Sequence, residues 1–176
     1  DEIYNQLCYD GPCPGGTRYA PQRTLLLRGF GKSYGMTGWR LGCAAGPKWL
    51  IEEMTKLQQY TFVCAPSMVQ WAGLAALDAD ISGHVNDYRR KRDLAVSLLE
   101  KDFELARPGG GFYIFPRIPQ RFENDFAFVE QAIANNVLII PGSVFSEQKT
   151  HFRLSYATTD EKIRQGCEIL CRIARG

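Results

Sequence analysis

The sequence has little net charge, few histidines and no long apolar run. Its formal net charge is +2, its only histidines are His84 and His151, and no segment is long enough to cross a bilayer. Nucleic-acid and membrane-surface proteins usually carry a dense positive field. The one basic run, residues 89–92, falls in a helical pattern and indicates a solvated helix face. We therefore expect no nucleic-acid or membrane partner.

The sequence also lacks any Cys-x-x-Cys pair. Cys167 and Cys171 are four apart on an expected helix, a spacing compatible with a metal, but no second pair accompanies them. We expect these two cysteines to pack in a core and expect no metal site. A disulfide framework is typical of small secreted chains, whereas this one has 176 residues and is 45% hydrophobic. The composition favours a globular cytoplasmic protein with one good core or two small ones.

One glycine-rich stretch organises the rest of the chain. Residues 29–42 read Gly-Phe-Gly-Lys-Ser-Tyr-Gly-Met-Thr-Gly-Trp-Arg-Leu-Gly, with one lysine, Lys32, and one arginine, Arg40, eight positions later. The apolar residues 24–27 before it and residues 39–45 around its end predict two strands. Lys32 is therefore expected on a turn at the end of a buried strand.

Three interpretations compete for Lys32. A phosphate-binding P-loop needs a glycine six residues before the lysine, where this chain has Leu26, and a helix directly after it, which Gly35 and Gly38 disfavour. A structural turn with an exposed lysine is the second interpretation. The third is a lysine that forms a Schiff base with a carbonyl cofactor, because a deprotonated amine is a good nucleophile.

The stretch from Gly29 to Gly42 resembles the lysine signature of the class I/II aminotransferases, fold-type-I enzymes that use pyridoxal 5′-phosphate (PLP). The resemblance implies that Lys32 carries the Schiff base and acts as the general base, and that Arg40 holds the cofactor phosphate. Many members of the family have serine at the positions of Gly29 or Gly31. That part of the phosphate binding must come from elsewhere in this protein.

Two further motifs are similar to the same family. The Asp-x-x-Tyr pattern at Asp1 and Tyr4 implies that Asp1 pairs with the pyridine nitrogen of PLP and that Tyr4 donates to its phenolate oxygen. Near the other end, Phe-Arg-Leu-Ser at residues 152–155 implies that Arg153 binds the α-carboxylate of the substrate. The alternation of this segment alone would favour an arginine on the solvent face of a strand.

The resemblance implies an α/β fold in three parts. Residues 1–80 would be the C-terminal part of the PLP-binding large domain, residues 81–102 an interdomain helix and residues 103–176 a small α+β domain. Periodicity predicts helices at residues 47–58, 67–77, 84–101 and 125–135, and a capping box at Thr158 and Glu161 predicts the start of the last helix. Further strands are expected at residues 103–106, 112–115, 137–140 and 151–156.

The implied function is a PLP-dependent aminotransferase that moves an amino group between an amino acid and a 2-oxo acid, as a homodimer. The chain opens inside the family's large domain, so we expect a C-terminal piece of a longer protein, inactive by itself. Two alternatives stay open. One is another fold-type-I activity, a β-lyase or a cyclopropane-carboxylate synthase, and the other is a non-catalytic fragment or interaction domain.

Overall fold

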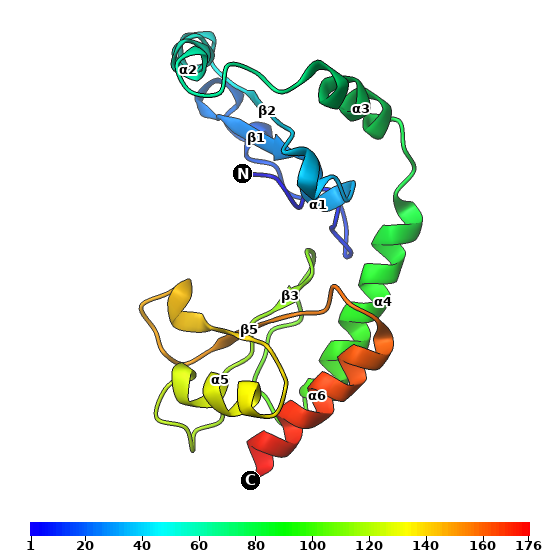
Figure 1. Ribbon diagram of the computed structural model, residues 1–176, viewed down its shortest axis with the longest axis vertical. Coiled ribbons are helices and arrows are strands. Elements are labelled where there is room, and N and C mark those ends of the chain that lie inside the picture. The colour runs from blue at the N-terminus through cyan, green and yellow to red at the C-terminus, as the bar shows by residue number, and fades with distance from the viewer. The chain divides into compact units, whose positions relative to one another are not determined.

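The computed structural model describes residues 1–176 and divides them into two compact units, Asp1–Val85 and Asn86–Gly176 (Figure 1). The division falls inside one long helix, α4 (Ser82–Leu99). Each unit is described by itself. No helix combines the length and the apolar character that crossing a membrane requires.

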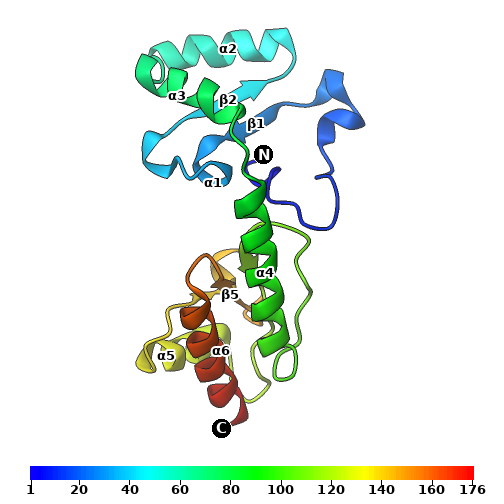
Figure 2. The ribbon, with the colours of Figure 1, turned by 90° about the vertical axis from the view of Figure 1, so that its right-hand side faces the viewer.

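The first unit is built on a two-stranded antiparallel ribbon. Strand β1 (Leu26–Gly29) pairs with β2 (Gly42–Ala45), with Gly29 opposite Gly42. The single-turn helix α1 (Phe30–Ser33) and a 3₁₀ turn (Thr37–Trp39) fill the connection. Helices α2 (Lys48–Gln59) and α3 (Ser67–Leu77) each follow a proline and lie on one side of the ribbon (Figures 1 and 2).

The core of this unit is small. Phe30 and Val69 are buried, and α3 approaches them closely at Gly73, where a Cβ atom would collide with the side chain of Leu41. The helices leave a large apolar surface exposed, formed by Trp49, Leu57, Tyr60, Phe62, Val63, Met68, Trp71, Leu74 and Leu77. Exposed apolar surface of this extent is typical of faces that contact other polypeptide.

Two predictions around the lysine stretch were wrong in detail. The strand before the lysine was expected to be buried and to span residues 24–27, but β1 begins at Leu26, and its Leu27 and Arg28 are exposed because the ribbon has only two strands. Lys32 follows it in the single helical turn α1, where the backbone N–H groups of Tyr34 and Met36 both bond to the carbonyl of Phe30. The second strand begins at Gly42 instead of residue 39. Arg40 adopts the left-handed conformation, with φ of 53°, and this interrupts an extended backbone.

The second unit packs helices against a three-stranded antiparallel sheet of order β3-β5-β4. The strands are β3 (Tyr113–Ile114), β4 (Ile140–Pro141) and the central β5 (Phe152–Ser155). The helices are the greater part of α4, α5 (Asp125–Ala134) and α6 (Asp160–Arg175). Figure 2 shows α4 and α6 side by side, and the thiol of Cys171 donates to the carbonyl of Leu98 between them.

Aromatic side chains form the centre of this core. The rings of Phe103, Phe128 and Phe152 lie with centroids 4.9 to 5.9 Å apart. Such pairs add about 0.5–1.5 kcal/mol each beyond the burial of their area. Cys167 and Cys171 are buried on α6, and burial raises the pKa of the Cys167 thiol to about 12. Both cysteines are therefore packed, as expected.

Three strand and cap predictions in this unit were wrong. Residues 103–106 form no strand, because Phe103 continues the end of α4 and only the carbonyl of Glu104 accepts a bond, from Arg117. The expected strand 137–140 shortens to β4, since the N–H of Val137 still bonds to Ala132 at the end of α5. The cap of α6 is Thr159, which accepts from the N–H of Lys162, so the expected capping box is one residue out of place.

The basic run 89–92 is not a solvated face throughout. Arg92 is only 1% exposed, and its guanidinium donates to the carbonyl of Pro108 and the carboxylate of Asp93. The prediction failed here because hydropathy cannot identify an arginine that is buried and bonded inside the fold.

Candidate cofactor and substrate sites

A cavity of about 340 Å³ in the first unit brings together three of the predicted site residues. Asp1, Lys32 and Arg40 all line it, together with the glycines at positions 29, 31 and 42. The three charged side chains come from the N-terminal segment, from α1 and from the turn before β2. An amine, a guanidinium and a carboxylate thus surround a space large enough for a small organic molecule.

The backbone around Lys32 is fixed by hydrogen bonds at both ends of α1. The N–H of Phe30 donates to the carbonyl of Leu41 at 3.1 Å, and the hydroxyl of Thr37 donates to the carbonyl of Gly31 at 3.0 Å. Phe30 and Ser33 are buried on either side of the lysine. These contacts hold Lys32 at the end of β1 with its side chain at the cavity.

Arg40 is held in a strained backbone conformation. Its left-handed φ of 53° is uncommon for a residue with a Cβ atom and costs of order 1–3 kcal/mol. Its guanidinium donates from Nη1 to the carbonyl of Thr37 at 3.2 Å, which leaves its other donors available at the exposed rim of the cavity. Strain of this kind gathers at sites where a side chain must be aimed.

Gly29 has a local explanation in this chain. A Cβ atom there would lie 2.5 Å from Cδ1 of Ile3, which lines the same cavity. A serine at position 29 would therefore require Ile3 to move. The isoleucine and the glycine fit each other, and the cavity wall is apolar at this point.

The N-terminal segment is tied to β1. Asp1 accepts from the N–H of Ile3 at 3.0 Å, the N–H of Glu2 donates to the carbonyl of Leu27 at 2.8 Å, and Glu2 pairs with Arg28 at 3.2 Å. These bonds place the Asp1 carboxylate at the cavity. Tyr4 is not among the residues that line it.

Ser33 is a residue of this stretch that sequence reasoning missed. It is 7% exposed, and its hydroxyl oxygen is buried without a hydrogen-bond partner. An orphaned buried hydroxyl beside Lys32 is a costly feature that needs an explanation. The sequence signal was available, since Ser33 follows the lysine directly.

Arg153 lies in the second unit, on β5. Its neighbours Phe152 and Leu154 are buried, so the expected alternation is present. Its guanidinium carbon lies over the ring of Tyr113, 4.4 Å from the centroid, and over the ring of Phe145 at 4.3 Å. The simple interpretation of a strand arginine on a solvent face does not account for two aromatic contacts.

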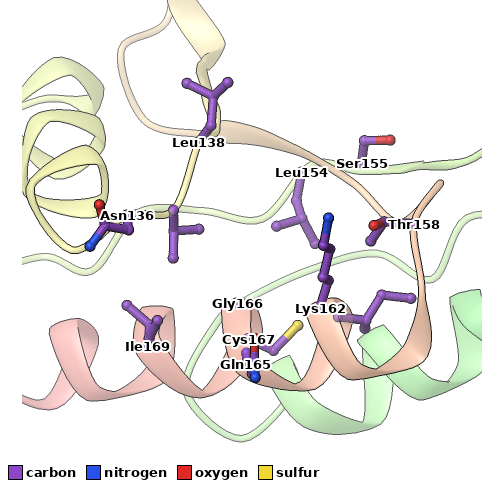
Figure 3. A pocket seen from close by; sticks show the side chains of 12 residues that line it. Asn136, Leu138, Leu154, Ser155, Thr158, Lys162, Gln165, Gly166, Cys167 and Ile169 are labelled. Atoms are coloured by element: carbon purple, nitrogen blue, oxygen red, sulfur yellow. The ribbon is translucent and has the colours of Figure 1, made fainter.

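A larger cavity of about 710 Å³ lies on the other side of this strand. Figure 3 shows Leu138 and Leu154 on one side of it and Lys162 and Ile169 of α6 on the other. Arg153 is not among the residues that line this cavity. The size of a cavity therefore does not locate the expected substrate site in this unit.

The loop beside Arg153 is held by two residues that sequence reasoning missed. The hydroxyl of Tyr156 donates to the carbonyl of Gly111 at 2.9 Å, and Arg92 donates to the carbonyl of Pro108 at 3.0 Å. Both side chains are fully buried. They fix the turn 108–111 that leads into β3 and hence the ring of Tyr113.

The structure contains no group of three or more His, Cys, Asp or Glu side chains placed to hold a metal ion.

Comparison with known protein families gives one match over nearly the whole chain. Residues 1–170 match the family model described as aminotransferase class I and II. The Bacillus subtilis protein YugH, named provisionally as an aminotransferase, is 39% identical over 187 residues, covering 99% of this chain and 47% of its own length. The aspartate/prephenate aminotransferase of Thermus thermophilus is 33% identical, over 98% of this chain and 46% of its own length.

Solved structures agree with the sequence comparison. A Pyrococcus protein superposes with a TM-score of 0.94 at 32% identity, over 99% of this chain and 48% of its own. A Thermus thermophilus aspartate aminotransferase mutant gives a TM-score of 0.91 at 33% identity, over 98% and 47%. The fold is thus a portion of the mixed α/β aminotransferase fold. The chain spans about half the length of the curated relatives it matches.

Proposed function

Because this chain belongs to the class I and II aminotransferases, we propose that it is part of an enzyme that moves an amino group from an amino acid to a 2-oxo acid, with PLP as its cofactor. The observation that carries the proposal is the cavity lined jointly by Asp1, Lys32 and Arg40. The names of the relatives include aspartate, prephenate and aromatic substrates, so the proposal extends to the reaction and not to one substrate side chain.

The residues of the cavity fit PLP by the chemistry of their side chains. When bound, PLP supplies a carbonyl that takes up the amino group and a ring that withdraws electrons from the substrate Cα. Arg40 binds the phosphate, Asp1 holds a proton on the ring nitrogen, and Lys32 Nζ accepts the proton from the substrate Cα. The glycines at positions 29, 31 and 42, which line the cavity, let the backbone approach an anion closely. Tyr4, which does not line the cavity, is proposed to donate to the ring oxygen.

Arg153 is proposed to bind the α-carboxylate of the substrate. A guanidinium offers a planar pair of N–H groups that matches a carboxylate in two parallel hydrogen bonds. A Thermus thermophilus aspartate aminotransferase, 32% identical to this chain, has a solved structure with maleate, a dicarboxylate. The presence of a dicarboxylate in that structure supports a carboxylate site here.

The arrangement of the enzyme follows from the same family. We propose that residues 1–80 are the C-terminal part of the large, cofactor-binding domain, residues 81–102 the interdomain helix and residues 103–176 the small domain. The division of the chain within α4 supports this arrangement. The active form is proposed to be a homodimer.

The test uses the full-length protein, a panel of amino donors and 2-oxo acids, and two lysine variants. Exchange of the amino group should be detected for the unchanged protein and for Lys48→Ala, a control on α2 whose side chain is 88% exposed. Lys32→Ala should lose nearly all turnover. Normal turnover of Lys32→Ala would refute the role of the lysine.

The same panel separates the alternative activities. A β-lyase would split one amino acid that carries a leaving group on Cβ into ammonia, a 2-oxo acid and the released group, without a need for an acceptor. Dependence of the product on an added 2-oxo acid supports aminotransfer, and product without an acceptor contradicts it.

A further inference from the structure

We propose that Tyr113 and Phe145 are positioning residues that hold the guanidinium of Arg153 ready for a carboxylate, an inference that rests on the proposed function. Neither residue is expected to touch the reacting atoms. Their contribution would be to fix the direction and preserve the charge of the arginine.

The contacts themselves are close. The guanidinium carbon of Arg153 lies 4.4 Å from the ring centroid of Tyr113 and 4.3 Å from that of Phe145, both well inside the roughly 6 Å over which a cation is attracted to an aromatic face. The two rings come from separate segments, β3 and the turn after the 3₁₀ helix Gly142–Val144. A free arginine side chain has high rotamer entropy, and two such contacts restrict it before a ligand arrives.

The charge of Arg153 is not neutralised by this chain. Most arginines of the second unit that make a short polar contact pair with a carboxylate, as Arg107 does with Asp93 and Arg175 with Asp102. Arg153 has no ion pair with a carboxylate, and its guanidinium contacts the rings of Tyr113 and Phe145 instead. Aromatic contacts hold a cation while its N–H donors remain available, which is the condition for a bidentate bond to an incoming carboxylate.

The rings are themselves anchored. Tyr113 lies opposite Ser155 in the sheet, and its ring is 4.8 Å from that of Phe112. The N–H of Phe145 donates to the carbonyl of Gly142 at 2.8 Å, and its ring meets the edge of Phe115 at 6.5 Å. Phe145 is nevertheless 49% exposed, so its position is not explained by burial in the core. Its contact with the guanidinium of Arg153 explains why position 145 has an aromatic residue.

The test measures carboxylate binding directly on the full-length protein, labelled with ¹⁵N arginine, with maleate as the probe. The Nε–Hε signal of Arg153, assigned by its loss in Arg153→Ala, should shift on addition of maleate. Phe145→Leu and Tyr113→Leu should each weaken maleate binding by about twofold to thirtyfold, the range expected for one cation–π contact. Phe145→Tyr and Tyr113→Phe keep a ring and should bind maleate as the unchanged chain does.

Two controls separate positioning from folding. Phe126→Leu removes an exposed phenylalanine from α5 and should leave maleate binding unchanged. In the absence of maleate, the leucine variants should move the Arg153 Nε–Hε signal away from its ring-shifted position while the backbone amide signals of the rest of the unit stay in place. If the amide signals of one leucine variant lose their dispersion, that variant is unfolded, and the other leucine variant then tests the positioning role.

The outcomes distinguish this inference from the proposed function. If Arg153→Ala abolishes maleate binding but both leucine variants bind as the unchanged chain does, the positioning role is wrong and the carboxylate role stands. If maleate does not shift the Arg153 signal in the unchanged chain, the carboxylate role is refuted and the positioning role with it. Weakening by leucine with recovery by the alternative aromatic residue supports both.

Discussion

Arg92→Ala is expected to destabilise the second unit far more than Arg90→Ala, two positions earlier on the same helix. Arg92 is 1% exposed and donates to the carbonyl of Pro108 at 3.0 Å and to Asp93 at 2.9 Å. Truncation of a large buried side chain and loss of its hydrogen bonds together cost about 3–5 kcal/mol of unfolding free energy. Arg90 contacts two carboxylates, of Asp87 and Asp160, but it is solvent-exposed. Exposed ion pairs contribute little because water and salt screen them.

The assay is urea unfolding of the chain and its two variants, followed by the far-ultraviolet circular dichroism of the helices. The midpoint should fall markedly for Arg92→Ala and only slightly for Arg90→Ala, and salt should reduce the small effect further. An equal or larger loss from Arg90→Ala would refute the reasoning, because it would mean that the number of ion pairs outweighs burial.

Three other outcomes are expected. Gly73→Ala places a Cβ atom against the side chain of Leu41, a clash that costs about 1–3 kcal/mol, while the better helix propensity of alanine in α3 offsets about 1 kcal/mol. The net loss of unfolding free energy should be at most about 2 kcal/mol in thermal unfolding, and a larger loss would show that Leu41 cannot move. Burial alone would raise the pKa of Asp125, but hydrogen bonds from Ser143 and from the N–H of Phe126 outweigh it and hold that pKa below its usual range. The Asp125 carboxylate therefore stabilises the fold above the unfolded pKa of about 3.9, and this stabilisation is lost as pH falls through the lower folded pKa. Asp125→Asn should remove this part of the pH dependence of urea unfolding. Finally, this chain by itself, given PLP and an amino acid with a 2-oxo acid, should show no steady turnover in a visible-absorbance assay, and sustained exchange would contradict that expectation.

Sequence reasoning predicted the helices better than the strands. The limits of α3 were predicted without error, and α4, α5 and α6 were placed within about two residues. A proline marks the start of α3, and capping side chains mark the starts of α5 and α6. The strands shifted where a single residue broke the extended backbone, as Arg40 does before β2. Residues 103–106 look like a strand by composition, yet Phe103 is drawn into the aromatic core at the end of α4. Such outcomes depend on tertiary contacts that no local pattern contains.

The candidate site was predicted in part. The glycine-rich motif predicted Lys32 and Arg40, and both residues line one cavity together with Asp1. Tyr4 does not line that cavity. The aromatic rings around Arg153 could not be predicted, because Tyr113 meets Arg153 only through the pairing of β3 with β5 and Phe145 meets it only through the turn after β4. Arg92 was missed because its burial depends on the carbonyl of Pro108, sixteen residues away.

The most direct test of the central claim is to identify the lysine that PLP labels. The full-length protein is incubated with PLP, reduced with borohydride and digested, and the modified peptide is sequenced by mass spectrometry. The cavity of Asp1, Lys32 and Arg40 predicts a single pyridoxyl group on Lys32 at one per chain, lost in Lys32→Ala and kept in Lys48→Ala. Stoichiometric label on another lysine, or undiminished label on Lys32→Ala, would contradict the assignment of this cavity as the cofactor site.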